Sequence, residues 1–184
     1  MSRLRIISGE FGGRLISADV GRATHPMGDR VRSALFNMID VRGKRVLDAY
    51  AGTGAVGLEA LSRGATHVDF VENDKKAQRV IAENIGILGV ETRAKLYKVS
   101  ASSYLEIAEK NELVYDVVFA DPPYHFFDKP DYFSTALELG KLVNNKGLMI
   151  LSYPGRLYVP TVNGVVVVDI RSYGDAALAV FRFD

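Results

Sequence analysis

The chain reads Val46-Leu47-Asp48-Ala49-Tyr50-Ala51-Gly52-Thr53-Gly54-Ala55-Val56-Gly57 where an apolar strand passes through a glycine loop into a helix. Gly52 and Gly54 permit a tight turn and a close approach of the backbone to a ligand, and the free N–H groups at the start of the helix attract an anionic group. Open α/β sheets bind ligands at the carboxyl ends of their strands, where this loop is expected. The stretch therefore predicts an α/β fold with a nucleotide-like ligand beside the strand at residues 44–48.

Strands and helices alternate on the C-terminal side of this loop. Apolar runs predict strands and periodic segments predict helices, in the order helix 55–63, strand 67–72, helix 75–88, strand 94–99, helix 102–110, strand 115–120, helix 132–143 and strand 147–152. Apolar strands connected by helices are typical of a parallel sheet covered on both faces. Two last strands, 162–170 and 176–183, have no helix between them, which predicts an antiparallel hairpin added to that sheet.

The N-terminal region is basic. Residues 1–45 carry nine Lys and Arg against four acids, whereas the remainder carries 14 against 18. We expect residues 1–28 to form a small basic extension with a hairpin over residues 3–22, ahead of a domain over residues 29–184, in which Asp29 caps a helix at 30–39. The charge favours an anionic partner, and a solvated basic end without a partner is the alternative.

Composition excludes several classes of protein. A chain of 184 residues can bury the core of one domain. The absence of cysteine excludes a disulfide scaffold, a zinc ribbon and a thiol nucleophile, and the three histidines, at 25, 67 and 125, are too scattered to suggest a metal site. The sequence lacks a signal peptide and any run of about 20 apolar residues, so we expect a cytoplasmic protein that does not contact a membrane.

A second motif, Asp121-Pro122-Pro123-Tyr124, directly follows the strand expected at 115–120. The two prolines fix φ and remove two backbone donors, so the corner is stiff and presents acceptors. A flat ligand with an amino group fits it, because the ring can stack on Tyr124 while the NH2 donates to Asp121 and to the Pro122 carbonyl. An ordinary proline-rich turn is the alternative interpretation.

Two acids indicate which ligand the glycine loop binds. The glycines also satisfy Gly-x-Gly-x-x-Gly, the dinucleotide fingerprint. Asp48, four residues before Gly52, would repel a pyrophosphate but attract an ammonium group, and Glu72 ends a strand where it can accept hydrogen bonds from ribose hydroxyls. S-adenosylmethionine satisfies both acids and the loop, although each acid alone is also typical of a solvated strand end.

These motifs, in this order and with a terminal hairpin, resemble a class I methyltransferase that acts on amino groups. The chain is more closely similar to the RsmD family, which methylates the exocyclic N2 of a guanine in bacterial 16S rRNA. Matching segments are Arg5–Gly9, the helix at 29–37 and Arg171–Asp175, so the resemblance spans nearly the whole chain. The chain departs from the family at residues 24–28, where Arg-Pro-Thr-Thr or Arg-Pro-Thr-Ser is usual, and at Ser100, where an Asp or Asn often meets the adenine.

The resemblance implies a Rossmann-like fold with a mostly parallel seven-stranded sheet. It also implies that S-adenosylmethionine is bound by Asp48, Ala49, Tyr50, Gly52, Gly54, Glu72, Asn73, Ser100 and Ala101. The residues that the resemblance assigns to catalysis are Asp121, Pro122, Pro123 and Tyr124. RNA phosphates are expected at Arg3, Arg5, Arg14, Arg30 and Arg32, with a structural role on the helix as the alternative, above all for Arg30. The implied partner is 16S rRNA in an assembling or assembled 30S subunit, bound by a monomer that needs no metal.

The expected reaction is a direct in-line transfer of a methyl group to nitrogen. Asp121 and the Pro122 carbonyl each accept one N–H of the amine and stabilise the positive charge that develops on nitrogen. The target base must leave its stack to reach them. Phe126 and Phe127, which follow in the sequence, are expected to serve loop packing more than the site.

The sequence is also compatible with other functions. An adenine-N6 DNA methyltransferase uses the same corner but usually has an added target-recognition domain, for which this chain has no length. A glutamine-N5 protein methyltransferase generally has Asn at the position of Asp121, and a nicotinamide oxidoreductase would not explain the second motif. A non-catalytic RNA-binding module for ribosome assembly would bind RNA without depending on the cofactor.

Overall fold

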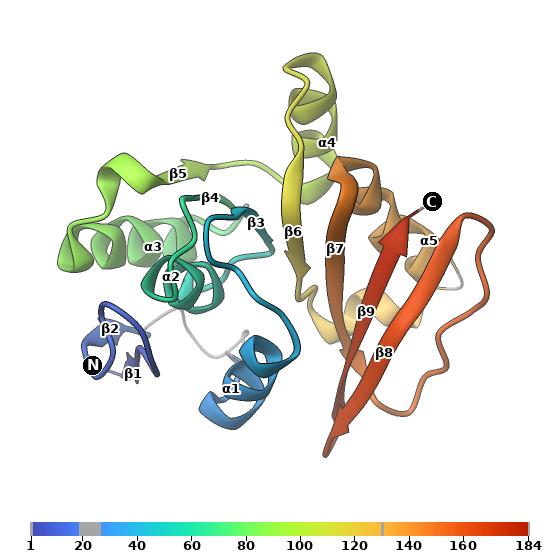
Figure 1. The fold of residues 1–184 in the computed structure, drawn as a ribbon, viewed down its shortest axis with the longest axis horizontal. Coiled ribbons are helices and arrows are strands. Elements are labelled where there is room, and N and C mark those ends of the chain that lie inside the picture. The colour runs from blue at the N-terminus through green and yellow to red at the C-terminus, as the bar shows by residue number, and fades with distance from the viewer. Residues whose placement is uncertain (1, 19–26, 130, 184) are drawn as a thin grey trace.

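The computed structural model describes residues 2–18, 27–129 and 131–183, and its centre is a seven-stranded sheet (Figure 1). The strand order is β5-β4-β3-β6-β7-β9-β8. The strands are β3 (Arg45–Ala49), β4 (His67–Val71), β5 (Ala94–Tyr97), β6 (Tyr115–Ala120), β7 (Val143–Pro154), β8 (Val165–Tyr173) and β9 (Ala176–Phe183). The first five are parallel and β9 is antiparallel to both of its neighbours. The expected Rossmann-like sheet with an antiparallel C-terminal hairpin is confirmed.

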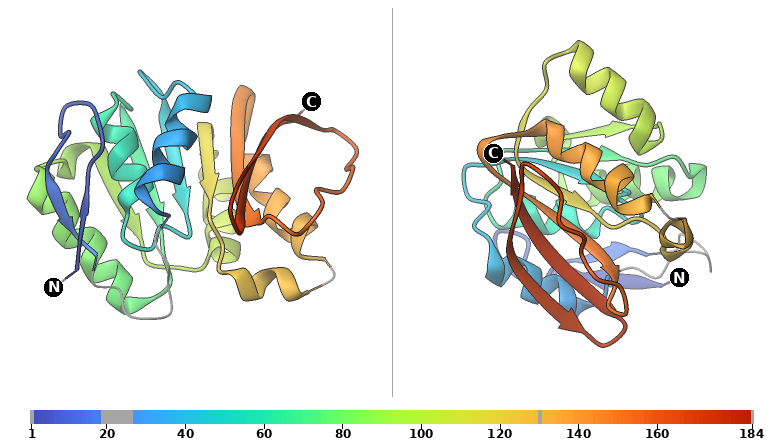
Figure 2. Two further views of the ribbon diagram at one scale, coloured as in Figure 1. Left: turned by 90° about the horizontal axis from the view of Figure 1, so that it is seen from below. Right: turned by 90° about the vertical axis from the view of Figure 1, so that its right-hand side faces the viewer.

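Helices cover both faces of this sheet (Figure 2). They are α1 (Asp29–Met38), α2 (Ala55–Ser62), α3 (Lys75–Leu88), α4 (Ala101–Lys110) and α5 (Tyr132–Leu137), with 3₁₀ turns at Glu91–Arg93, Tyr124–Asp128 and Glu138–Leu142. Within the described ranges, none of these helices combines the length and the apolar character needed to cross a membrane.

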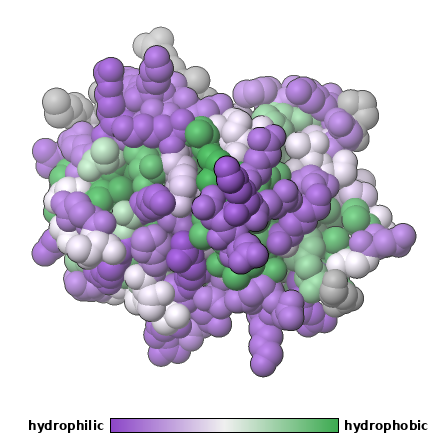
Figure 3. Space-filling model, turned by 90° about the horizontal axis from the view of Figure 1, so that it is seen from above, coloured by the Kyte–Doolittle hydropathy of each residue, from purple (hydrophilic) through white to green (hydrophobic). Residues whose placement is uncertain are grey.

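The inner strands β3, β4, β6, β7 and β9 are largely apolar because each contributes to a core on both faces, whereas the edge strand β8 is mostly exposed. In β6, Val117 and Phe119 belong to the apolar cluster beneath α1, α2 and α3, whereas Val118 and Ala120 belong to the cluster beneath α4 and α5. This is the alternation that a strand imposes on its side chains. Hydrophilic side chains dominate the outer surface on the side of α4 (Figure 3).

Three predicted elements differ from the structure. The helix expected at 132–143 ends at Leu137 and continues as a 3₁₀ turn, and β7 begins at Val143 and not at Gly147. The register between β6 and β7 shifts after Tyr115, and the Asn144 side chain bonds Asp116 in this irregular stretch. β8 runs on to Tyr173, so the hairpin turn has two residues, with Gly174 at φ 62°.

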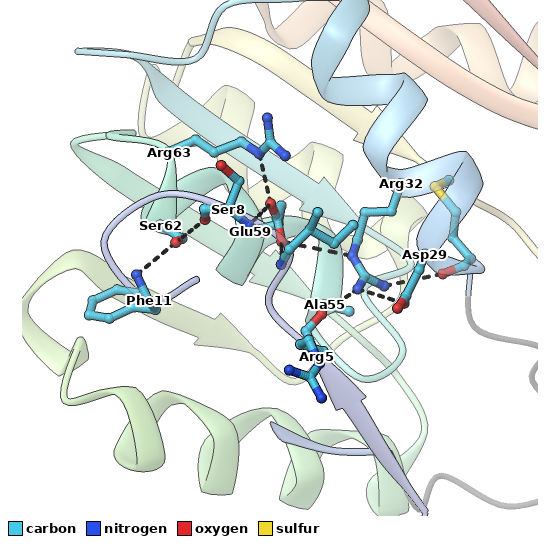
Figure 4. A network of polar contacts seen from close by, with 12 residues as sticks. Arg5, Ser8, Phe11, Asp29, Arg32, Ala55, Glu59, Ser62 and Arg63 are labelled. Carbon is cyan, nitrogen blue, oxygen red and sulfur yellow. Dashed lines mark hydrogen bonds and ion pairs between the residues drawn. The ribbon is translucent and has the colours of Figure 1, made fainter. Parts of the chain in front are cut away.

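The N-terminal hairpin, β1 (Arg3–Arg5) and β2 (Leu15–Ser17), is docked on α2 (Figure 4). Glu59, fully buried in α2, accepts the N–H groups of Ile7 at 2.7 Å and Ser8 at 3.1 Å. Gly9 has φ 86°, and a Cβ there would lie 1.9 Å from the Ser62 carbonyl oxygen, so this contact requires glycine. The hairpin thus packs on the core of the sheet domain, and a domain boundary at residue 28 stays a prediction. Residues 19–22 of the expected hairpin lie outside the described residues.

Two expectations for α1 are wrong. Gly28 occupies the N-cap without a side-chain hydrogen bond, and Asp29 lies inside the first turn, where its carboxylate accepts from Arg32 at 3.0 Å. Arg32 is fully buried and also donates to the carbonyls of Arg5 at 2.6 Å and Met27 at 3.2 Å. A side chain without exposed surface cannot reach an RNA phosphate, so Arg32 is the structural arginine of this helix, and Arg30 is the exposed one.

Candidate functional site

The carboxyl ends of the parallel strands bring the two sequence motifs together. Ala49 of β3 pairs with Val71 of β4 on one side and with Ala120 of β6 on the other. The next residues along these strands, Tyr50, Glu72 and Asp121, therefore lie beside one another at one edge of the sheet. β3 lies between β4 and β6, so the strands that follow it in the sequence are placed on both of its sides. Open α/β sheets form their ligand crevice at such a point of reversal in the strand order.

Glu72 holds the glycine loop in place. Its two carboxylate oxygens accept the N–H groups of Gly52 and Asp74, each at 2.8 Å. Gly52 and Gly54 have φ values of 55° and 77°, which other residues rarely adopt. Gly52 is half-buried, whereas Thr53 and Gly54 are buried at the start of α2, and Glu72 remains partly exposed beside the loop. The expected free N–H groups are not found here, because Gly54 donates to the Ala51 carbonyl and Ala55 to the Thr53 hydroxyl.

Asp48 is the buried carboxyl group of the first motif. Its side chain lies in β3 with 3% of the residue exposed, and one oxygen accepts the Gly57 N–H at 2.8 Å. Burial raises the pKa of Asp48 to about 8, the Gly57 N–H opposes this shift, and the charges of Asp121 and Glu72 add to it. A cationic ligand group would favour the ionised form, because opposite charge lowers the pKa of a carboxyl group.

A cavity of about 230 Å³ lies beside the glycine loop. Five expected cofactor residues line it, namely Tyr50, Glu72, Asn73, Ser100 and Ala101. Asp48, Ala49, Gly52 and Gly54 are not in its lining. The remaining walls, which the sequence did not indicate, are Val71, Val99, Ser102, Leu105, Phe126, Thr135, Glu138 and Leu139.

Three residues of this lining have defined contacts or backbone geometry. The hydroxyl of Ser100 accepts the Ser103 N–H at 3.1 Å and so caps α4. Tyr50 has φ 62°, a strained value for a residue with a side chain, and its ring meets that of Phe126 edge-on at 5.8 Å. Phe126 therefore belongs to the cavity wall, whereas Phe127 is the packing residue, with its ring 4.2 Å from that of Tyr132. The position of Phe126 directly after the second motif was the available signal.

The second motif forms a corner with one buried and one exposed end. Asp121 is half-buried and Pro122 is buried, whereas Tyr124 keeps 44% of its surface exposed. The Asp121 N–H points to the Ala49 carbonyl at 3.5 Å, which ties the corner to β3. Burial raises the pKa of the Asp121 carboxyl group, and a hydrogen bond from Ser152 lowers it. The carboxyl group and the exposed ring of Tyr124 are therefore presented at the same corner.

The arginines expected to bind RNA lie apart from the cavity. Arg3, Arg5 and Arg14 are exposed on the hairpin, where the guanidinium of Arg14 lies 5.3 Å from the centre of the Phe11 ring. Arg30 is exposed on α1. Exposure leaves these four side chains free to meet an anionic surface, and their role stays a prediction.

Comparison with known proteins agrees with this geometry. Residues 4–182 match the family described as Conserved hypothetical protein 95. A Bacillus subtilis protein named "Putative rRNA methyltransferase YlbH" is 33% identical over 182 residues, which are 97% of this chain and 98% of the relative. "Ribosomal RNA small subunit methyltransferase D" of Haemophilus influenzae is 37% identical over 126 residues, 67% of this chain and 65% of that protein.

The fold has a close counterpart among solved structures. "Putative methyltransferase yhhF from Escherichia coli" superposes with a TM-score of 0.82 at 25% identity, covering 100% of this chain and 99% of the other. The sheet order, the flanking helices and the terminal hairpin are those of a class I methyltransferase fold.

Proposed function

The chain belongs to the Conserved hypothetical protein 95 family, and we propose that it transfers a methyl group from S-adenosylmethionine to the exocyclic N2 of a guanine in 16S rRNA. The names of its relatives in Bacillus subtilis and Haemophilus influenzae support methylation of ribosomal RNA. The amino group as the acceptor rests on one observation. The half-buried carboxyl group of Asp121 and the adjacent Pro122 carbonyl offer two acceptors at the ligand edge of the sheet.

The residues that line the cavity suit the chemistry of the cofactor. Glu72 lies where a carboxylate can accept hydrogen bonds from ribose hydroxyls, and the rings of Tyr50 and Phe126 supply apolar walls for a flat base. Asp48, which lies outside the lining of this cavity, offers a buried carboxyl group to a cationic group. The bound cofactor supplies a methyl group activated by a sulfonium.

The corner residues act on the amine that receives the methyl group. The lone pair of a guanine N2 is delocalised into the ring, so the amine is a weak nucleophile until it pyramidalises. Asp121 and the Pro122 carbonyl favour that geometry by accepting one N–H each, and they stabilise the positive charge that forms on nitrogen. Tyr124 receives the face of the base once it has left its stack. Holding the reacting atoms in line supplies much of the remaining acceleration.

The exposed arginines of the hairpin and α1 bind the phosphates that flank the target. Arg3, Arg5, Arg14 and Arg30 carry positive charge on elements that precede the sheet. Contacts to phosphate position an RNA without reading its sequence, and such binding weakens as salt rises. We propose that the RNA is presented in an assembling or assembled 30S subunit.

The test incubates the purified protein and labelled S-adenosylmethionine with under-methylated 30S subunits and, separately, with naked 16S rRNA. Nucleoside analysis of the product is expected to give N2-methylguanosine, and Asp121→Ala is expected to lower the rate about 100-fold or more. If the product is N6-methyladenosine, the target base is adenine and not guanine. RNA binding without transfer or cofactor dependence would support the non-catalytic assembly module.

A further inference from the structure

Ser152 of β7 is held beside Asp121 by the sheet. Ala120 of β6 pairs with Leu151 of β7, so Asp121 and Ser152 follow these partners at the same level of two parallel strands. On its other side Ser152 pairs with Leu178 of β9. Only 5% of Ser152 is exposed. Its hydroxyl group is therefore fixed at the corner by strands on both sides.

The two residues share a small cavity that is almost entirely apolar. Among the residues that line it, only Asp48, Asp121 and Ser152 are polar. The others are Met27, Leu35, Val56, Phe119, Ala120, Ile150 and Leu178. A carboxylate in such surroundings needs donors to remain ionised, and the Ser152 hydroxyl is a side-chain donor in this lining.

Other titratable groups face the same cavity. Asp48 approaches from β3, and the charges of Asp121 and of Glu72, at the end of β4, raise the pKa of Asp48, whereas α1 contributes the uncharged Leu35 to the lining. Burial raises the pKa of Tyr124, on the same segment as Asp121. The charges of Asp121 and of Asp175, in the hairpin turn, add to this shift, and Arg156, which follows β7, opposes it. Burial raises the pKa of Asp121, and the hydrogen bond from Ser152 acts in the opposite direction.

We propose that Ser152 is a positioning residue for methyl transfer, whose hydroxyl donates to the Asp121 carboxylate and keeps it an acceptor toward the amino group of the target base. A protonated Asp121 would present an O–H donor and would repel the N–H groups of the amine. The role in transfer rests on the proposed function, whereas the link between Ser152 and the ionisation of Asp121 does not.

The first experiment follows the titration of Asp121 in the whole chain by carbon NMR of labelled aspartate, with the signal assigned through Asp121→Asn. Ser152→Ala is expected to move the midpoint of Asp121 to higher pH by about one unit. Ser152→Thr keeps a hydroxyl group and is expected to return the midpoint toward the wild-type value. Ser62→Ala is the matched control, since it removes another buried serine hydroxyl at a site remote from this cavity.

The second experiment measures the rate of transfer against pH. The rise of kcat with pH is expected to shift upward in Ser152→Ala, so that activity falls about tenfold below the new midpoint and recovers above it. An unchanged midpoint in Ser152→Ala, or an equal shift in Ser62→Ala, would overturn the proposal. If the wild-type protein transfers no methyl group to RNA, the proposed function fails, and the NMR midpoints still decide whether Ser152 controls Asp121.

Discussion

Two buried acids in one strand–loop–helix unit have opposite surroundings. Glu59, in the middle of α2, accepts backbone N–H groups from Ile7 and Ser8 and pairs with the Arg63 guanidinium at 2.7 Å. The Arg32 guanidinium lies 4.0 Å away (Figure 4). Asp48, in the preceding strand, accepts one hydrogen bond within the described part of the chain, from Gly57. The acid that holds the hairpin is saturated with donors, and the acid at the ligand edge has acceptor capacity to spare.

The difference is the one expected between a structural acid and an acid that binds a ligand, without reference to sequence motifs. A buried carboxylate is costly unless its oxygens are paired, so Glu59 contributes stability only through its donors. Asp48 lacks such pairing, and burial raises its pKa to about 8. A site whose charge is balanced only when a cation arrives is typical of a binding site. Matched carboxamide substitutions can therefore test the contrast.

The largest effect is expected from Glu59→Gln. The carboxamide keeps the volume but removes the charge that faces two guanidinium groups, so the free energy of unfolding should fall by about 3 kcal/mol. Urea denaturation at neutral pH measures this loss. A loss below about 1 kcal/mol would mean that the hairpin is held by its apolar side chains alone.

Asp48→Asn is expected to affect binding of the cofactor more than stability. At about pH 4 the free energy of unfolding should stay within about 1 kcal/mol of the wild-type value, because the carboxamide then replaces a protonated carboxyl group of similar shape. Binding of S-adenosylmethionine, measured by calorimetry, should weaken by about 10- to 100-fold. A stability loss as large as that of Glu59→Gln would erase the distinction between the two acids.

The pH dependence of stability sharpens the comparison. The pKa of Asp48 is raised to about 8 in the folded protein, whereas an aspartate in an unfolded chain titrates near its ordinary value of 3.8. The folded state then binds more protons than the unfolded state between these values, so the contribution of Asp48 to stability falls as pH rises through that range.

Relative to the wild type, Asp48→Asn should therefore gain about 2 kcal/mol of stability between about pH 5 and about pH 6.5. Urea denaturation of both proteins across this range measures the gain. A constant difference would show that Asp48 is ionised throughout and that the protein supplies donors to it.

The smallest effect concerns the strained residue of the glycine loop. Tyr50 has φ 62°, so Tyr50→Gly should be more stable than Tyr50→Ala by about 1 kcal/mol, although both remove the ring. Equal stabilities would mean that the loop relaxes when the ring is lost. Both variants should bind the cofactor more weakly than the wild type, since Tyr50 lines the cavity.

The sequence predicted the sheet and its ligand edge because these follow from local patterns. Apolar strands, glycines with positive φ and the Asp-Pro-Pro corner each carry a short-range signal, and parallel pairing then aligns Glu72 with Asp121. The tight hairpin turn was missed because Arg171, Ser172 and Tyr173 read as loop residues, whereas pairing with β9 extends the strand over them.

Long-range pairing explains the remaining differences. Glu59 lies in a helix that was correctly expected, yet its donors Ile7 and Ser8 are more than fifty residues away in the sequence. Arg32 reads as an exposed cation because the carbonyl of Arg5, which it bonds, belongs to another element. The Ser152 hydroxyl is likewise relevant only through the neighbouring strand. Partners of this kind cannot be read from the spacing of residues along the chain.

The attachment of the hairpin to α2 has a consequence for target choice. α2 begins at the glycine loop and carries Glu59, which holds the hairpin. The basic hairpin and the glycine loop are therefore both attached to one helix. If the hairpin arginines bind phosphates, the distance between the bound phosphates and Asp121 is constant. An RNA would then be selected by how far its extruded base lies from a rigid backbone landmark, with few contacts to the base sequence.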